Sequence, residues 1–217
     1  MKTLLLIISI SLLFADINIV DENLNLKKRG IKSWMDFKNQ NVVKQKHDYS
    51  CGSASLATIL RYFYNLNISE RDILKEVISN KKGKIYKNIG LSFFELGEFV
   101  KRRGFKAIGL ALNIDSLKNL KIPVIIYVKI RRDTHFTVFR GVDRKFVYLA
   151  DPSLGNIKVR LSKFKEMFYG VNELKYRGKI LAILPKNRDI KTNREFLKKR
   201  DSSNINYKIL ILNQLFN

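Results

Sequence analysis

Apolar positions follow a helical period through the first half of the chain. They predict three helices, over residues 52–65, 69–79 and 92–103. The second and third each open with a serine followed three residues later by an acidic residue, which is the pattern of a capping box. A glycine at 104 is expected to end the third helix. In the first helix, the apolar face recurs at spacings of three and four residues: Ala54, Ala57, Leu60, Tyr64.

The second half changes to the two-residue alternation and β-branched runs of strands. Two short helical segments are predicted between them, at 114–120 and 162–168. Only two polar residues separate the third strand from the fourth, which predicts a hairpin. Helices first and consecutive strands later favour an α+β fold with an antiparallel sheet. The strand-like segments are 105–112, 122–130, 135–142, 145–151, 156–161 and 178–185.

Length and composition indicate one folded domain with appendages. The chain has 217 residues, of which 46% are hydrophobic, and this is enough for a real core. It carries 42 Lys and Arg against 19 Asp and Glu, a formal net charge of +23. The cations are dispersed and accompany no zinc-finger, RNP or helix-turn-helix pattern, so specific nucleic-acid binding is not expected. An acidic partner, an anionic membrane surface and a merely solvated lysine-rich surface remain open.

The N-terminus has the pattern of a secretory signal peptide over residues 1–15. Lys2 is followed by a mostly apolar run over residues 4–14 and by Ala15 before a cleavage point. That run is shorter than the about 20 residues of a membrane span. We therefore expect export, and a periplasmic location in a Gram-negative source. The alternatives are an uncleaved segment that anchors the chain to the inner membrane, or a buried core segment.

Residues 16–39 are polar and mixed, and they are interpreted as an N-terminal extension. Trp34 and Phe37 are expected to anchor this region onto the core, together with Val42 and Val43.

Cys51 is the only cysteine in the chain. A single cysteine in an exported protein indicates a reactive thiol, an intermolecular disulfide or a small buried residue. It stands where the first predicted helix begins, and the free N–H groups and positive dipole end there favour an anionic thiolate. Neighbouring N–H groups could also donate to an oxyanion. Gly52 is expected to let a substrate approach the backbone closely.

A cysteine nucleophile needs a base, and the chain has two histidines. His135 opens the third predicted strand, and Asp151 ends the fourth, sixteen residues on. Antiparallel neighbours bring the start of one strand beside the end of the next, so Asp151 is expected to hold the His135 ring. His47, four residues before Cys51, is the alternative base.

These residues lie in two segments that resemble the motifs of C39 peptidases, the papain-related bacterial proteases that process bacteriocin leaders. The segment "QKHDYSCGSASLATILRYF" resembles the cysteine motif, with Gln45 six residues before Cys51. The segment "THFTVFRGVDRKFVYLADPSLG" resembles the histidine motif, with Asp151 and Pro152 after the hairpin. Two further segments, "IGLSFFELGEFVKRRGFKA" and "LSKFKEMFYG", resemble the middle helix and the part after the Asp-Pro. The resemblance covers residues 40–185.

The resemblance implies a papain-like fold and a role for each motif residue. Cys51 would attack the scissile carbonyl, His135 would act as base and then acid, and Asp151 would orient His135. The Gln45 amide and the Cys51 backbone N–H would stabilise the oxyanion. No metal or cofactor is implied.

On this basis we expect a cysteine endopeptidase that cleaves exported polypeptides. The peptidase domain is predicted over residues 40–185, followed by a basic tail over residues 186–217. The chain carries no P-loop motif or six-helix membrane domain, which favours a stand-alone exported member of the family. The alternatives are a papain-like thiol acyltransferase or amidase, and a non-catalytic module that binds peptides.

Overall fold

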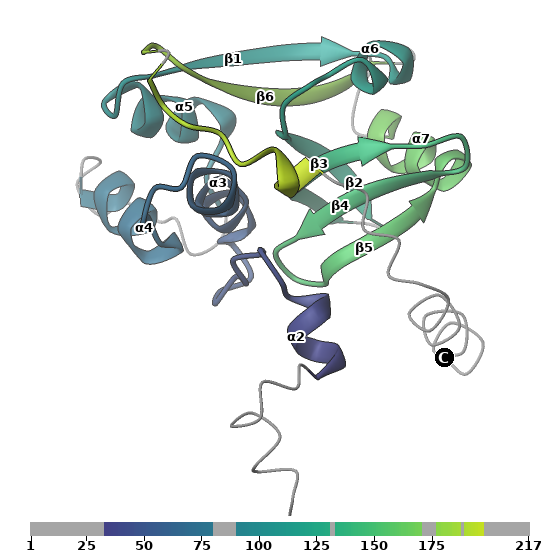
Figure 1. Ribbon diagram of the computed structural model, residues 1–217, viewed down its shortest axis with the longest axis horizontal. Coiled ribbons are helices and arrows are strands. Elements are labelled where there is room, and N and C mark those ends of the chain that lie inside the picture. Colours follow the sequence, from purple (N-terminus) through teal and green to yellow (C-terminus); the bar gives the residue numbers. More distant parts are fainter. Residues whose placement is uncertain (1–32, 80–89, 131–132, 171–176, 188, 198–217) are drawn as a thin grey trace, which may run out of the picture. The chain divides into compact units, whose positions relative to one another are not determined.

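The computed structural model describes residues 33–79, 90–130, 133–170, 177–187 and 189–197 (Figure 1). The chain divides into two compact units, residues 1–38 and 39–217. The described part of the first unit contains the short helix α2 (Trp34–Lys38). The predicted signal peptide and residues 198–217 of the predicted basic tail lie outside the described residues. No helix within the described ranges is long and apolar enough to cross a membrane.

The second unit contains every helix and strand that the periodicity predicted, with each end placed to within three residues. Its helices are α3 (Cys51–Tyr62), α4 (Glu70–Ser79), α5 (Phe93–Lys101), α6 (Ile114–Lys118), α7 (Leu161–Tyr169) and the 3-10 turn η3 (Arg194–Leu197). Its strands are β1 (Phe105–Leu112), β2 (Val124–Ile130), β3 (Asp133–Val142), β4 (Phe146–Asp151), β5 (Gly155–Arg160) and β6 (Gly178–Pro185).

The strands form one antiparallel sheet, in the order β1-β6-β2-β3-β4-β5. The predicted hairpin joins β3 to β4, and the side chain of Asp143 closes its turn. One carboxylate oxygen accepts the N–H groups of Lys145 and Phe146, at 2.8 and 2.7 Å. Aspartate favours such turns because its short side chain reaches the backbone two residues on. The α+β prediction with an antiparallel sheet is therefore confirmed.

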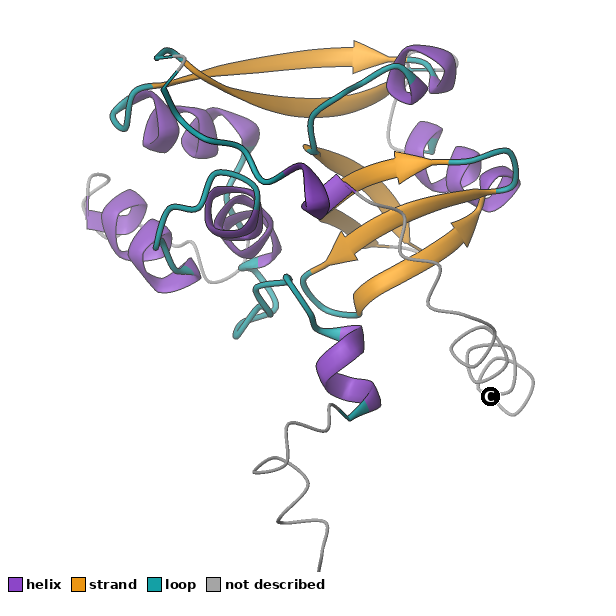
Figure 2. Cartoon of the chain, in the orientation of Figure 1, coloured by secondary structure: helices purple, strands orange, loops and turns teal. Residues whose placement is uncertain are grey.

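Helices cover both faces of the sheet (Figure 2), and β2 shows how one strand serves both. Ile125 points into the cluster formed with α3, α4 and α5. Val124, Ile126 and Val128 join the opposite cluster with α6 and α7. Alternate side chains of a strand face opposite sides, so a strand covered on both needs an unbroken apolar run. This explains why residues 122–130 lack polar alternation.

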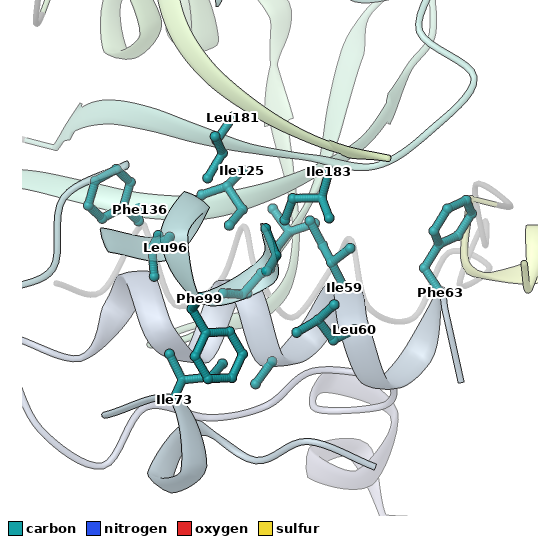
Figure 3. Packing of buried hydrophobic residues seen from close by; sticks show 14 of the residues in the cluster. Ile59, Leu60, Phe63, Ile73, Leu96, Phe99, Ile125, Phe136, Leu181 and Ile183 are labelled. Carbon is teal, nitrogen blue, oxygen red and sulfur yellow. The ribbon is translucent and has the colours of Figure 1, made fainter. Parts of the chain in front are cut away.

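Helix α3 is buried on every side from Gly52 to Leu60, rather than on the one face that its spacing predicted. Figure 3 shows its Ile59 and Leu60 between the sheet residue Ile183 on one side and Ile73 of α4 on the other. Many of the buried residues of α3 have small side chains, so neighbouring elements can pack closely around the helix on all sides. The end of the helix also differs from the prediction, since α3 stops at Tyr62.

The buried hydroxyl groups of α3 are all hydrogen-bonded. Ser53 donates to the Ser50 carbonyl at 2.8 Å, and Thr58 donates to the Ala54 carbonyl at 2.8 Å. Ser55 donates to the carbonyl of Phe136 on β3, at 3.2 Å. Buried polar groups are tolerated when they are paired in this way. The Ser55 bond links the N-terminal half of α3 to Phe136, the residue that follows His135.

The predicted helix ends depend on side-chain and glycine caps that the structure contains. Ser69 and Asp72 cap α4, with the Asp72 carboxylate accepting the Ser69 N–H at 2.9 Å. Ser92 and Glu95 form the capping box of α5. Gly104 adopts a φ of +79°, a left-handed conformation that favours glycine, just after α5. Both capping predictions and the glycine stop are confirmed.

Two expectations about the flanking regions change. Trp34 and Phe37 belong to α2 of the first unit, in which no residue is buried. Val42 of the second unit is 5% exposed and belongs to its core. Within the predicted basic tail, Phe196 of η3 is fully buried and its ring lies 6.4 Å from that of Phe63. Arg140 of β3 donates to the Phe196 carbonyl at 2.7 Å. The polar and basic composition of residues 186–217 gives no indication that Phe196 is buried.

Tyr64→Phe is expected to destabilise the fold without changing its packing. The buried Tyr64 hydroxyl donates to the carbonyl of Ile183 on β6, and burial raises the pKa of Tyr64 to about 12. Removing the donor leaves a buried carbonyl unpaired, at a cost of about 1–3 kcal/mol. Urea unfolding of the purified chain measures the difference. Tyr62→Phe is the control, and an equal loss in both variants would contradict this account.

Candidate active site

Cys51 is the first residue of α3, and a closed turn sets the start of that helix. Ser50, which precedes it, donates from its hydroxyl and its N–H to the His47 carbonyl, at 2.7 and 3.0 Å. The Ser50 hydroxyl also accepts the His47 N–H at 3.1 Å. The Cys51 thiol is free and partly exposed. It therefore lies at the positive end of a 12-residue helix, where unpaired N–H groups favour an anion.

Gly52 has a different role from the one expected. It is buried, and a Cβ at this position would lie 3.1 Å from the Phe136 ring and 3.4 Å from the Leu96 side chain. The Phe136 and Leu96 side chains occupy the space next to Gly52, so a substrate does not approach the backbone there. Gly52 thus lets the head of α3 lie close against β3, which carries His135.

His135 lies between the other two candidate residues. Its Nε2 atom is 3.0 Å from Oδ2 of Asp151, and the Cys51 side chain lies near enough to the ring to affect its pKa. Because Asp151 occupies Nε2, the nitrogen that remains for the thiol is Nδ1. The hairpin register accounts for the first contact. Val138 of β3 pairs with Ala150 of β4, so the start of β3 runs beside the end of β4.

Asp151 is 1% exposed, and the chain around it satisfies its carboxylate. One oxygen accepts the N–H groups of Ser153 and Leu154, both at 2.9 Å, and the other faces His135. Burial alone would raise the pKa of Asp151. The hydrogen bond and charge of His135 and the two backbone N–H groups outweigh burial, and they hold the pKa of Asp151 below its usual range. The carboxylate is therefore ionised at neutral pH.

The same contacts set the charge of His135. Burial alone would lower the pKa of His135, but the hydrogen bond and negative charge of Asp151, together with the neighbouring Cys51 side chain, raise it to about 9. The ring is thus an imidazolium at neutral pH, held between a carboxylate and a sulfur. This arrangement supports nucleophilic chemistry at the thiol, with a proton ready on the neighbouring ring.

Gln45 lies beside the Asp-Pro turn, far from the hairpin in sequence. Its backbone N–H donates to the Pro152 carbonyl at 3.0 Å. Its side-chain oxygen accepts the Ser153 hydroxyl at 2.8 Å, and its amide nitrogen donates to the His47 carbonyl at 3.1 Å. The structure thus brings Gln45 to the loop that carries Asp151, and its side chain bonds to Ser153 of that loop and to His47 of the loop that leads to Cys51.

His47, the alternative base, does not join this group. Its ring is stacked on that of Tyr49, with ring centroids 5.1 Å apart, and it is exposed. Asp151 is committed to His135 instead. Across the described residues, no cluster of three His, Cys, Asp or Glu side chains could hold a metal ion.

Sequence reasoning missed Ser153 and Ser55. Ser153 bonds both Asp151 and Gln45, and Ser55 fixes α3 to β3. The position of Ser153 directly after the Asp-Pro was a signal, because serine commonly follows an aspartate in turns. Nothing in the sequence singled out Ser55 from the other small residues of α3.

Comparison with known proteins identifies the family. The model of the peptidase C39 family matches residues 39–174. The chain belongs to the peptidase C39 family. The family predicted from the cysteine and histidine motifs is therefore confirmed.

Curated relatives of this C39 chain include two proteins from Pseudomonas. Over 131 residues it is 35% identical to "Probable functional amyloid protease FapD" of Pseudomonas fluorescens, a match that covers 60% of this chain and 58% of that protein. The protein of the same name from Pseudomonas aeruginosa is 32% identical over 130 residues, with the same coverage. The match thus spans less than two thirds of the length of these relatives.

Solved structures share the fold. A double glycine motif protease from an AMS/PCAT transporter, in complex with its leader peptide, has a TM-score of 0.52 at 24% identity and covers 66% of this chain and 90% of its own. The peptidase domain of Streptococcus ComA has a TM-score of 0.53 at 21% identity and covers 66% of this chain and 97% of its own. These neighbours confirm the predicted papain-like C39 fold.

We expect the His135 imidazole of this C39 chain to titrate near pH 9. Because this value exceeds the about 6.5 of an unfolded histidine, the proton stabilises the fold below about pH 6.5, and that contribution is lost as the pH rises through about 9. In Asp151→Asn the midpoint should fall, since the largest raising contact is removed. NMR of ring-labelled histidine measures both, with His47→Gln assigning the second signal. An unchanged midpoint in Asp151→Asn would contradict the assignment of cause.

Proposed function

We propose that this C39 chain is a cysteine endopeptidase that cleaves exported polypeptides. Cys51 is the nucleophile, His135 the acid and base, and Asp151 the residue that orients His135. The observation that supports this most is the position of the His135 ring, which is hydrogen-bonded to Asp151 and has the Cys51 side chain as its other polar neighbour. Membership of the peptidase family supports the reaction class.

The reaction follows from the charges of these three groups. The Cys51 thiolate adds to the scissile carbonyl carbon, and the carbonyl oxygen becomes an oxyanion. The His135 imidazolium then protonates the leaving amine as the C–N bond breaks, which leaves a thioester on Cys51. The neutral His135 takes a proton from water, the water attacks the thioester, and the acid product leaves. Asp151 keeps its charge throughout and stabilises each imidazolium.

Two donors serve the oxyanion in this proposal. The backbone N–H of Cys51 lies in the first turn of α3, where N–H groups have no partner within the helix. The Gln45 amide supplies the second donor. It has two N–H bonds, of which the His47 carbonyl accepts one. Donors already oriented before the reaction stabilise developing charge without reorganisation.

The substrate class rests on relatives and on charge. Two relatives are named as functional amyloid proteases, and a structural neighbour is a protease in complex with a leader peptide. A polypeptide substrate fits both. The proposed signal peptide over residues 1–15 would deliver the peptidase domain, residues 40–185, to the periplasm. The net charge of +23 favours an acidic substrate or partner.

We expect Cys51→Ala to abolish peptide cleavage while the fold persists. The purified full chain is incubated with a peptide library, and mass spectrometry identifies the products. The variant lacks the only thiol, and its circular dichroism melt should match that of wild type. Cleavage that survives in Cys51→Ala would refute the proposal. A wild-type chain that transfers acyl groups to amines but cleaves no library peptide would indicate the acyltransferase instead.

The two histidines offer a matched comparison. His135→Ala should lower kcat/KM on a library-derived peptide by about 10²–10⁴-fold, the usual contribution of an acid–base group. His47→Ala should stay near wild type, because its ring stacks on Tyr49 away from the Asp151 contact. Steady-state kinetics on both variants provide the measurement. A larger loss in His47→Ala would reverse the assignment.

A further inference from the structure

The Gln45 side chain is held at both ends by polar groups of two different loops. Its amide nitrogen donates to the His47 carbonyl at 3.1 Å, on the loop that leads to Cys51. Its oxygen lies 2.8 Å from the Ser153 hydroxyl, on the turn that follows Asp151. Gln45 and Ser153 are 108 residues apart in sequence. This contact therefore joins the two loops on which the proposed chemistry depends.

The partners decide which way the amide faces. A backbone carbonyl only accepts hydrogen bonds, so the His47 carbonyl requires the nitrogen end of the Gln45 amide. The oxygen end must then face Ser153, whose hydroxyl donates its one proton to it. A rotated amide would place two oxygens against each other at His47. The second N–H bond of the Gln45 nitrogen is left for an acceptor outside these loops.

We propose that Ser153 is a positioning residue for catalysis: its hydroxyl holds the Gln45 amide in the orientation that keeps the second N–H of its nitrogen for the oxyanion. This inference rests on the oxyanion role proposed for Gln45. Ser153 acts on Gln45 through its side chain and on Asp151 through its backbone N–H. The two effects are separable, because a substitution of the hydroxyl leaves the N–H in place.

The Gln45 loop and the turn after Asp151 are also joined by other hydrogen bonds. Removing the Ser153 hydroxyl is therefore expected to leave the positions of both loops unchanged. The Gln45 backbone N–H donates to the Pro152 carbonyl at 3.0 Å, and the Lys44 ammonium donates to the Ser153 carbonyl. Ser153 itself is exposed. Ser153→Ala therefore frees the Gln45 amide to rotate while the loops, the Asp151 contact and the protonation of His135 persist.

Two probes that react with Cys51 by different routes provide the test on the full chain. p-Nitrophenyl acetate acylates a thiolate through a tetrahedral oxyanion, whereas iodoacetamide alkylates it by direct displacement without one. Cys51 is the only thiol, so both rates are read against Cys51→Ala. Loss of an oxyanion donor costs about 10²–10³-fold, and we expect this for acylation of Gln45→Ala. For Ser153→Ala we expect about tenfold, because the donor remains but is no longer oriented.

The iodoacetamide rate and the NMR titration of His135 should be unchanged in Ser153→Ala. Ser153→Thr, which keeps the hydroxyl, should restore acylation. In a Gln45→Ala background, Ser153→Ala should cost nothing further, since residues that act through one group are not additive. Ser116→Ala, an exposed serine of α6, is the control.

Three results would overturn the proposal. They are an unchanged acylation rate in Ser153→Ala, an equal loss in the presence and absence of Gln45, and an equal loss with iodoacetamide. The proposed function fails separately, because in that case wild-type Cys51 would react with neither probe faster than an ordinary exposed thiol.

Discussion

The buried hydrogen bond between Asp151 and His135 is the interaction on which the rest of the site depends. A carboxylate that is 1% exposed is costly unless every lone pair finds a partner. Here the partners are an imidazolium at 3.0 Å and two N–H groups at 2.9 Å. Removing any of them would leave a buried charge incompletely paired, and this penalty is what fixes the turn after β4 and the rotamer of His135. The same contact keeps the His135 ring protonated at neutral pH, beside the Cys51 side chain.

Packing between α3 and β3 brings the sulfur to that ring. Gly52 leaves room for Phe136, and the Ser55 hydroxyl binds the Phe136 carbonyl at 3.2 Å. Both contacts involve the residue that follows His135, so the head of α3 is held against the strand on two sides. Because α3 is buried all round, it can hardly shift without opening the core. The distance between thiol and imidazole is thus set by the hydrophobic core as much as by their mutual attraction.

The fold could be predicted from the sequence because the helical period of the first half differs clearly from the two-residue alternation of the second. The His135–Asp151 pair could be predicted because one hairpin contains both residues. The features that could not be predicted from the sequence depend on contacts between segments that are far apart in the chain. A glycine in the sequence does not indicate which neighbour occupies the space beside it, and at Gly52 that neighbour is Phe136 rather than a substrate. The spacing of apolar residues in α3 indicates one buried face, because the small and polar residues on its other faces give no sign in the sequence that they are buried. Ser153 and Phe196 acquire their roles only when loops far apart in the chain meet.

The net charge of +23 acts against the imidazolium, since a positive field disfavours adding another proton. His135 nevertheless keeps a pKa of about 9, because the contacts with Asp151 and Cys51 outweigh the effect of burial. Charges on the surface are screened over about 10 Å at 0.1 M salt, while a buried pair is screened far less. The charge of His135 is therefore determined by the groups that contact its ring rather than by the dispersed lysines and arginines of the surface.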